Sequence, residues 1–157
     1  KLEQCVYPGS DYPEGRATVP IPYTSSKKYK LTIPAQWLDP STLPYVTPGF
    51  WSITVYKHKD GTLPDTYNNA YPTIYQPFKP LRPDSNGDVQ VLIQSKPLSV
   101  DSPYNWLPGP EDSGVDFYLI LRVYGPNGKM YGKDQPDGEP VPPWTAPIVT
   151  EYLEGEE

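Results

Sequence analysis

The chain has 157 residues, a length that suits one domain with a core that needs no disulfide crosslinks. Its 23 Pro and 12 Gly residues interrupt the chain too often for long helices and favour short strands joined by rigid turns. The formal net charge of −6, with scattered Lys and Arg, argues against nucleic acid as a partner, and no apolar run is long enough for a spanning helix.

Residues 1–26 are rich in Pro and predict an extended N-terminal arm, because Pro cannot donate to the ladder of a central strand. A first strand is predicted over residues 28–33, where apolar and polar residues alternate. Residues 50–56 give a stronger strand signal. The Asp60-Gly61 turn that follows indicates a hairpin.

A weaker strand over residues 71–76 contains Pro72, which places it at a sheet edge. The tight turn at Asn86-Gly87 precedes residues 89–94, whose alternation predicts a strand with one buried face. Residues 117–124 are apolar or aromatic on both faces. They predict a central strand that is covered on both sides.

Residues 148–153 predict a closing strand before an acidic tail over residues 154–157. Short strands separated by Pro and Gly turns favour an all-β fold, an antiparallel β-sandwich of jelly-roll-like type. We therefore expect three parts: an extended arm over residues 1–26, a single sandwich domain over residues 27–153, and the tail.

Four blocks carry a family resemblance: YKL at residues 29–31, FWSITVY at 50–56, NWLP at 105–108 and FYLILRVYGP at 117–126. Over roughly residues 28–150 the chain resembles the domain of unknown function 1214 family, a β-sandwich module often found as the C-terminal half of two-domain bacterial proteins. The resemblance implies a fold more than an activity. It also implies a signature set with structural roles: Trp51, Asn105, Trp106, Arg122, Tyr124 and Trp144.

Two features depart from the family pattern. The partner domain that usually accompanies this module is absent from the sequence, so a site shared between the two domains would be missing. Residues 1–26 do not match the usual entry into the module, where a strand and an acidic-glycine turn are expected.

Catalytic and metal-binding patterns are weak. The single His, His58, precedes a turn between two Lys residues, which does not favour a nucleophilic triad, and one His with one Cys cannot supply a zinc site. Residues 84–88 (DSNGD) offer oxygen ligands for Ca²⁺, but a hairpin turn is the favoured interpretation. Glu111, Asp112 and Asp116 leave a carboxylate-dependent hydrolase open. We expect no catalytic residue, metal or cofactor.

Aromatic residues suggest a different function. The 4 Trp and 14 Tyr can stack on sugar rings or contribute to protein interfaces. Trp51 is predicted to lie in the core. Trp37, Trp106 and Trp144 lie near Pro-rich loops and are the candidates for glycan stacking.

Arg122 lies in the most apolar predicted strand, where a charge must be paired or reach the edge of the sheet. The favoured interpretation is a structural ion pair with Asp116 or another carboxylate. A role as an anchor for a ligand is the alternative.

The leading functional hypothesis is a non-enzymatic, extracellular structural subunit that associates with itself as a homo-oligomer or helical filament. In this hypothesis the arm adds a strand to the sheet of a neighbour through main-chain hydrogen bonds. An arm that folds back onto its own sandwich is the competing interpretation, and a carbohydrate-binding or adhesive module is the second functional hypothesis. The residues expected at the subunit interface are Leu2, Cys5, Val6, Tyr7, Val19, Ile21 and Tyr23.

Overall fold

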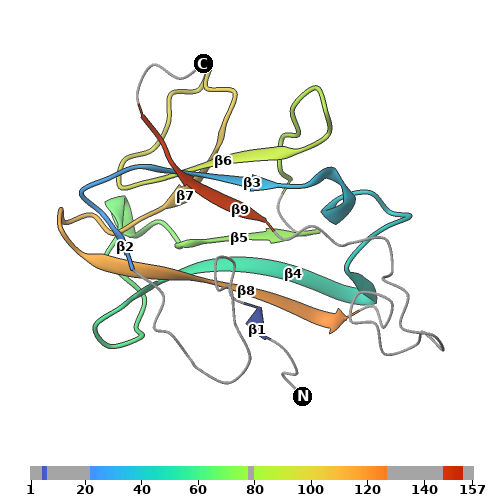
Figure 1. The fold of residues 1–157 in the computed structure, drawn as a ribbon, viewed down its shortest axis with the longest axis horizontal. Coiled ribbons are helices and arrows are strands. Elements are labelled where there is room, and N and C mark those ends of the chain that lie inside the picture. Colours follow the sequence, from blue (N-terminus) through green and yellow to red (C-terminus); the bar gives the residue numbers. More distant parts are fainter. Residues whose placement is uncertain (1–4, 7–21, 78–79, 127–146, 154–157) are drawn as a thin grey trace.

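The computed structural model describes residues 5–6, 22–77, 80–126 and 147–153 of the chain. These residues form two sheets that lie face to face, with the strands of each sheet running across the molecule (Figure 1). The protein is an all-β sandwich, as the Pro and Gly spacing predicts.

The first sheet, called sheet A, is built on the two longest strands, β4 (Tyr45–Lys57) and β8 (Asp116–Pro126). Its strand order is β1-β8-β4-β5, and β2 also pairs with β8. The other strands are β1 (Cys5–Val6), β2 (Tyr23–Thr24) and β5 (Thr73–Gln76). The predicted positions of residues 71–76 at an edge and of residues 117–124 in the middle of a sheet are therefore correct. The prediction that residues 117–124 are covered on both sides is wrong, because the outward side chains of Tyr118, Arg122 and Tyr124 are only half-buried.

The second sheet, called sheet B, has the order β7-β6-β3-β9. Its strands are β3 (Tyr29–Ile33), β6 (Val89–Gln94), β7 (Asn105–Pro108) and β9 (Ile148–Glu151). The β6–β7 pair is parallel, unlike the antiparallel pairing expected throughout. Parallel neighbours cannot be joined by a tight hairpin, so residues 95–104 return the chain to the starting end of β6 before β7 begins.

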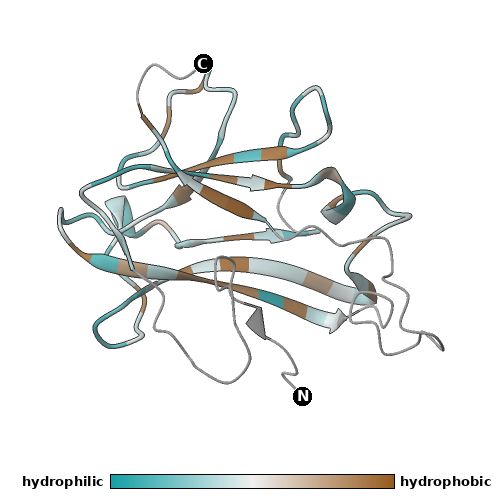
Figure 2. Ribbon diagram, viewed as in Figure 1, coloured by the Kyte–Doolittle hydropathy of each residue, from teal (hydrophilic) through white to brown (hydrophobic). Residues whose placement is uncertain are grey.

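The core lies between the two sheets and follows the period-two alternation of each strand, which Figure 2 shows as alternating hydropathy along the ribbons. From sheet A, β4 contributes Trp51, Ile53 and Val55, and their side chains are fully buried. A short 3₁₀ helix, η1 (Ala35–Trp37), adds a second indole. Trp51 Nε1 donates a hydrogen bond to the Trp37 carbonyl oxygen at 3.1 Å, so the largest core residue has its polar atom satisfied.

The described parts of the predicted arm pair with β8 of the same chain. Cys5 lies opposite Arg122 in the β1–β8 ladder, and Tyr23 lies opposite Phe117 in the β2–β8 ladder. Tyr23 also packs on Tyr29 with ring centroids 4.9 Å apart, and burial raises the pKa of its phenol. The remaining residues of the expected interface, Leu2, Tyr7, Val19 and Ile21, lie outside the described residues.

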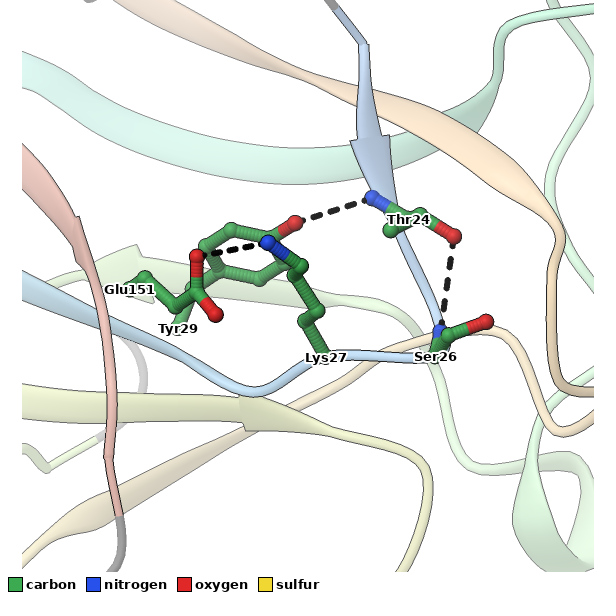
Figure 3. A network of polar contacts seen from close by, with 5 residues as sticks. All are labelled: Thr24, Ser26, Lys27, Tyr29 and Glu151. Atoms are coloured by element: carbon green, nitrogen blue, oxygen red, sulfur yellow. Dashed lines mark hydrogen bonds and ion pairs between the residues drawn. The ribbon is translucent and has the colours of Figure 1, made fainter.

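Polar contacts connect β2 of sheet A to β3 of sheet B, and the turn between β2 and β3 to β9 (Figure 3). The backbone N–H of Thr24 donates to the Tyr29 hydroxyl at 3.1 Å. Lys27 Nζ lies 2.8 Å from a Glu151 carboxylate oxygen. The Lys27–Glu151 pair is exposed and contributes little to stability, whereas the Thr24–Tyr29 bond fixes the turn that carries the chain from one sheet to the other.

Candidate functional site

The outer face of sheet A carries an unusual set of side chains. Successive side chains of a strand point to opposite faces, so the odd-numbered residues of β4 and β8 enter the core and the even-numbered ones point away from it. The outward residues of β4 are Phe50, Ser52, Thr54 and Tyr56. Those of β8 between its ends are Tyr118, Ile120, Arg122 and Tyr124.

The register of the three strands arranges these side chains in rows across the sheet. Ser52 lies opposite Arg122 of β8 on one side and Tyr75 of β5 on the other. Directly opposed side chains in such a ladder have Cβ atoms about 4.5 to 5.5 Å apart, close enough to contact one ligand together. The side chains of Arg122, Ser52 and Tyr75 therefore start from one row across the sheet.

The next row along the sheet forms a fixed floor. Thr54 lies opposite both Ile120 and Thr73. The hydroxyls of Thr54 and Thr73 are 2.8 Å apart, and Thr73 Oγ1 donates to the Ile53 carbonyl oxygen at 3.0 Å. Both threonines are buried, so this row is held in one arrangement.

Aromatic pairs close the two ends of the β4–β8 face. Phe50 and Tyr124 stack with ring centroids 4.2 Å apart and planes tilted by 17°. Tyr56 and Tyr118 stack with centroids 5.9 Å apart and planes tilted by 22°. Phe50 and Tyr56 are six positions apart on β4, which corresponds to roughly 20 Å along an extended strand.

Between these pairs the surface is hollowed into an open cavity of about 540 Å³, called the aromatic trough. This volume lies within the usual range for small-molecule sites. The trough is lined by Phe50, Ser52, Thr54, Tyr56, Tyr71, Thr73, Tyr75, Arg122 and Tyr124.

Arg122 lies along the floor of the trough. Its Cζ atom is 5.2 Å from the centroid of the Tyr56 ring, so the half-buried side chain extends along the sheet past Ile120 and Thr54. The expected ion pair with Asp116 does not form, because six residues of one extended strand place the two residues roughly 20 Å apart. Among the described residues, no carboxylate forms an ion pair with Arg122.

The family model for proteins of unknown function DUF1214 matches residues 18–128, which include β2 to β8. The chain belongs to this family. A search among curated proteins gives no significant match.

The crystal structure of the VPA0106 protein from Vibrio parahaemolyticus is similar to this DUF1214 chain, with a TM-score of 0.51 and 22% sequence identity. The match covers 82% of the present chain and 26% of that protein, so the chain spans about a quarter of the length of its structural neighbour. At this level of identity the likeness shows the fold.

Neither of the two described Trp residues that are predicted to stack on glycans, Trp37 and Trp106, lines the trough. The prediction for Trp37 is wrong, because η1 inserts this side chain into the core and leaves it 1% exposed. Trp106 is half-buried on β7 of sheet B, where its indole N–H donates to the Gln94 carbonyl oxygen at 3.0 Å. Trp144 lies outside the described residues. Trp51 is in the core, where the strand pattern puts it.

The trough residues that the sequence interpretation missed are mainly tyrosines. Tyr56, Tyr71 and Tyr75 come from β4, from the segment before β5 and from β5 itself. The sequence could have indicated Tyr56, because in β4 the two aromatic residues Phe50 and Tyr56 alternate with the core positions and enclose Ser52 and Thr54 on the outward face. Tyr124 was assigned a structural role only, and it is here a wall of the trough.

Other predicted positions have structural partners. Asn105 is buried and bonds the backbone of Arg82 in both directions, with its amide nitrogen also donating to the Gln90 carbonyl oxygen at 3.1 Å. Asp84 accepts hydrogen bonds from the Gln90 side chain at 3.0 Å and from the Asn86 backbone at 2.8 Å, and these bonds lower its pKa. Residues 84–88 therefore form a turn stabilised by its own carboxylate.

Within the part of the chain that the structure describes, no three His, Cys, Asp or Glu side chains gather into a group that could hold a metal ion. The same residues contain no helix with the length and apolar character needed to cross a membrane.

Proposed function

We propose that the chain is a non-enzymatic binding module that holds a carbohydrate in the aromatic trough. The observation that carries the proposal is the pair of aromatic stacks, Phe50–Tyr124 and Tyr56–Tyr118, at the two ends of a face that presents the half-buried Ser52 and Tyr75 between them. Aromatic rings offer flat apolar faces to the C–H faces of a sugar, and hydroxyl groups satisfy its polar edge.

The shape of the trough favours a short oligosaccharide over a compact ligand. The trough is open to solvent, and its aromatic ends lie roughly 20 Å apart along β4. An extended ligand can lie across the sheet, whereas a small one would leave one aromatic pair unused. The lining residues are suited to stacking and hydrogen bonding rather than to acid–base chemistry.

Calorimetric titration with oligosaccharides, both neutral hexose oligomers and uronic acid oligomers, tests this function. Tyr124→Ala and Phe50→Ala each remove half of one stack, and we expect either substitution to weaken binding about tenfold, the upper end for one aromatic contact. Tyr104→Ala is the matched control, because Tyr104 belongs to another aromatic pair, with Tyr152 at 6.0 Å, beside sheet B. Equal binding by all four proteins, or no binding of any oligosaccharide, would contradict the proposal.

Self-association through the N-terminal strand is the second candidate function, as a subunit of an extracellular oligomer or filament. The observation in its favour is that β1 and β2 contribute only two residues each to the edge of β8. Ladders this short can be exchanged for the same segment of a neighbour, since the edge of β8 accepts either.

Light scattering and negative-stain electron microscopy of the full chain and of a variant lacking residues 1–21 test this candidate. The truncation keeps Tyr23, which packs against Tyr29 and Phe117. We expect oligomers of the full chain and monomers of the truncated variant. Monomers in both samples would refute self-association through the N-terminal strand.

A further inference from the structure

The aromatic trough contains one feature that a neutral sugar does not need, the guanidinium of Arg122. Arg is always charged at neutral pH, and placing it on a strand between aromatic walls has a desolvation cost. The side chain is half-buried and contacts the Tyr56 ring, with its Cζ atom 5.2 Å from the ring centroid. An aromatic ring face attracts a cation without accepting its N–H groups as a carboxylate would, so the N–H donors of the guanidinium stay available for other partners.

No described residue supplies an anion for these N–H donors. The described lining of the trough contains no Asp or Glu, and the ion pairs among described residues join Lys27 to Glu151 and Lys57 to Asp60. The N–H donors of an Arg have a planar geometry that matches a carboxylate in a two-bond arrangement.

Given the carbohydrate-binding function proposed above, on which this step rests, we infer that the ligand of the aromatic trough is an acidic saccharide, a uronic acid unit whose carboxylate binds the edge of the Arg122 guanidinium. Ser52 lies opposite the Arg122 backbone, whereas the guanidinium lies toward Tyr56, so the Ser52 hydroxyl can bond a hydroxyl of the neighbouring sugar. The aromatic stacks would then hold the adjoining sugar rings.

The negative net charge of the whole chain favours a ligand with few negative charges. With a formal net charge of −6, the protein repels densely charged anions such as sulfated polymers at long range, and one Arg cannot balance several negative groups. A carboxylate carries a single charge and matches a single guanidinium. This comparison favours uronic acids over sulfated or phosphorylated sugars.

The experiment compares neutral hexose oligomers that carry one galacturonate, mannuronate or glucuronate unit with their methyl esters, which have the same sugar rings but no charge. We expect at least one acid to bind the full chain about tenfold or more tighter than its ester, the usual effect of a charged hydrogen bond. In Arg122→Met the acid and its ester should bind equally. Arg122→Lys keeps the charge but not the two-bond geometry, and it should recover only part of the preference.

Thermal denaturation of both Arg122 variants establishes that each is folded before binding is measured. Esters that bind the full chain as well as acids, with binding still lost in Tyr124→Ala, would overturn the acidic ligand and leave the carbohydrate function standing. A preference for acids that persists in Arg122→Met would also overturn the inference. No binding of acids or esters would refute both proposals together.

Discussion

The outer faces of the two sheets follow the same alternation but carry different chemistry. On sheet B the polar side chains satisfy one another: Thr32 Oγ1 donates to Gln90 Oε1 at 2.8 Å, and Gln90 Nε2 donates to Asp84 Oδ2 at 3.0 Å. On sheet A the outward positions hold stacked aromatic rings and Arg122, whose guanidinium edge faces no described carboxylate.

This difference supports sheet A, rather than sheet B, as the face of the proposed ligand site. A set of internally bonded polar groups gains little from a partner, since any new hydrogen bond must replace an existing one. Aromatic surface gains binding free energy from contact with a ligand, and N–H donors without a protein acceptor gain it from a hydrogen bond to the ligand. The contrast between sheet A and sheet B is therefore an argument for the position of the ligand site, and variants on each face can test it.

The largest effect is expected from the core that both faces share. Trp51→Ala removes a fully buried indole that bonds the Trp37 carbonyl, and we expect it to lower the free energy of unfolding by about 3 to 5 kcal/mol. Urea denaturation followed by circular dichroism measures this loss. A loss below about 1 kcal/mol would mean that Trp51 does not have the buried position described.

A smaller loss of stability is expected at Asn105, whose side-chain hydrogen bonds join the start of β7 to the backbone of Arg82 and Gln90. Asn105→Ala leaves the backbone of Arg82 and the Gln90 carbonyl without their side-chain partner and should lower the free energy of unfolding by about 1 to 3 kcal/mol. Asn105→Asp keeps the shape but cannot donate to the two carbonyls, so it should be destabilised as well. Oligosaccharide affinity should not change in either variant, because Asn105 belongs to sheet B.

A matched pair of substitutions compares the outer faces directly. Gln90→Ala removes two side-chain hydrogen bonds on sheet B and should cost about 0.5 to 1.5 kcal/mol of stability with unchanged affinity for oligosaccharide. Ser52→Ala on sheet A should change stability by less than about 0.5 kcal/mol but weaken binding. Thermal denaturation measures the stability of both variants, and calorimetric titration measures their affinity for oligosaccharide. Weaker binding in Gln90→Ala but not in Ser52→Ala would place the ligand on sheet B and contradict the proposed site.

The smallest effect is expected from Asp84, which lies at the turn before β6. Hydrogen bonds from Gln90 and from the backbone lower its pKa below the ordinary value of 3.8. Folding therefore gains stability from this carboxylate above pH 3.8, and the gain is lost as the pH falls through the lower pKa of the folded state. Wild type should melt above Asp84→Asn at neutral pH, and the difference should shrink in acid; a constant difference would contradict this role.

The elements of the fold follow largely from local patterns. The alternation at residues 29–33 and 89–94 predicts β3 and β6, and the apolar run at residues 117–124 predicts β8. The turn at Asp60-Gly61 also forms, since Gly61 has a φ of 69° and its N–H donates to the Lys57 carbonyl. That turn does not lead straight into a partner strand, however, because β5 begins only at Thr73.

The site depends on features that the sequence does not display locally. The aromatic trough exists only because β4 pairs with β5 and β8 in one register, which brings Ser52, Tyr75 and Arg122 into a row. That register depends on packing between distant segments. The burial of Trp37 likewise depends on a three-residue 3₁₀ helix for which the composition gives no signal. The aromatic content suggests sugar stacking as a hypothesis, but the residues that it singles out are Trp rather than the Tyr residues that line the trough.

The alternation of β4 and β8 has an evolutionary consequence. Each strand devotes one set of positions to holding the sandwich together and the interleaved set to the surface of the trough. Outward positions such as Phe50, Ser52 and Tyr124 can therefore be exchanged without rebuilding the interior. Under the proposed function, relatives that share this fold could vary the ligand through these positions, as long as the pairing of β4 with β8 keeps its register.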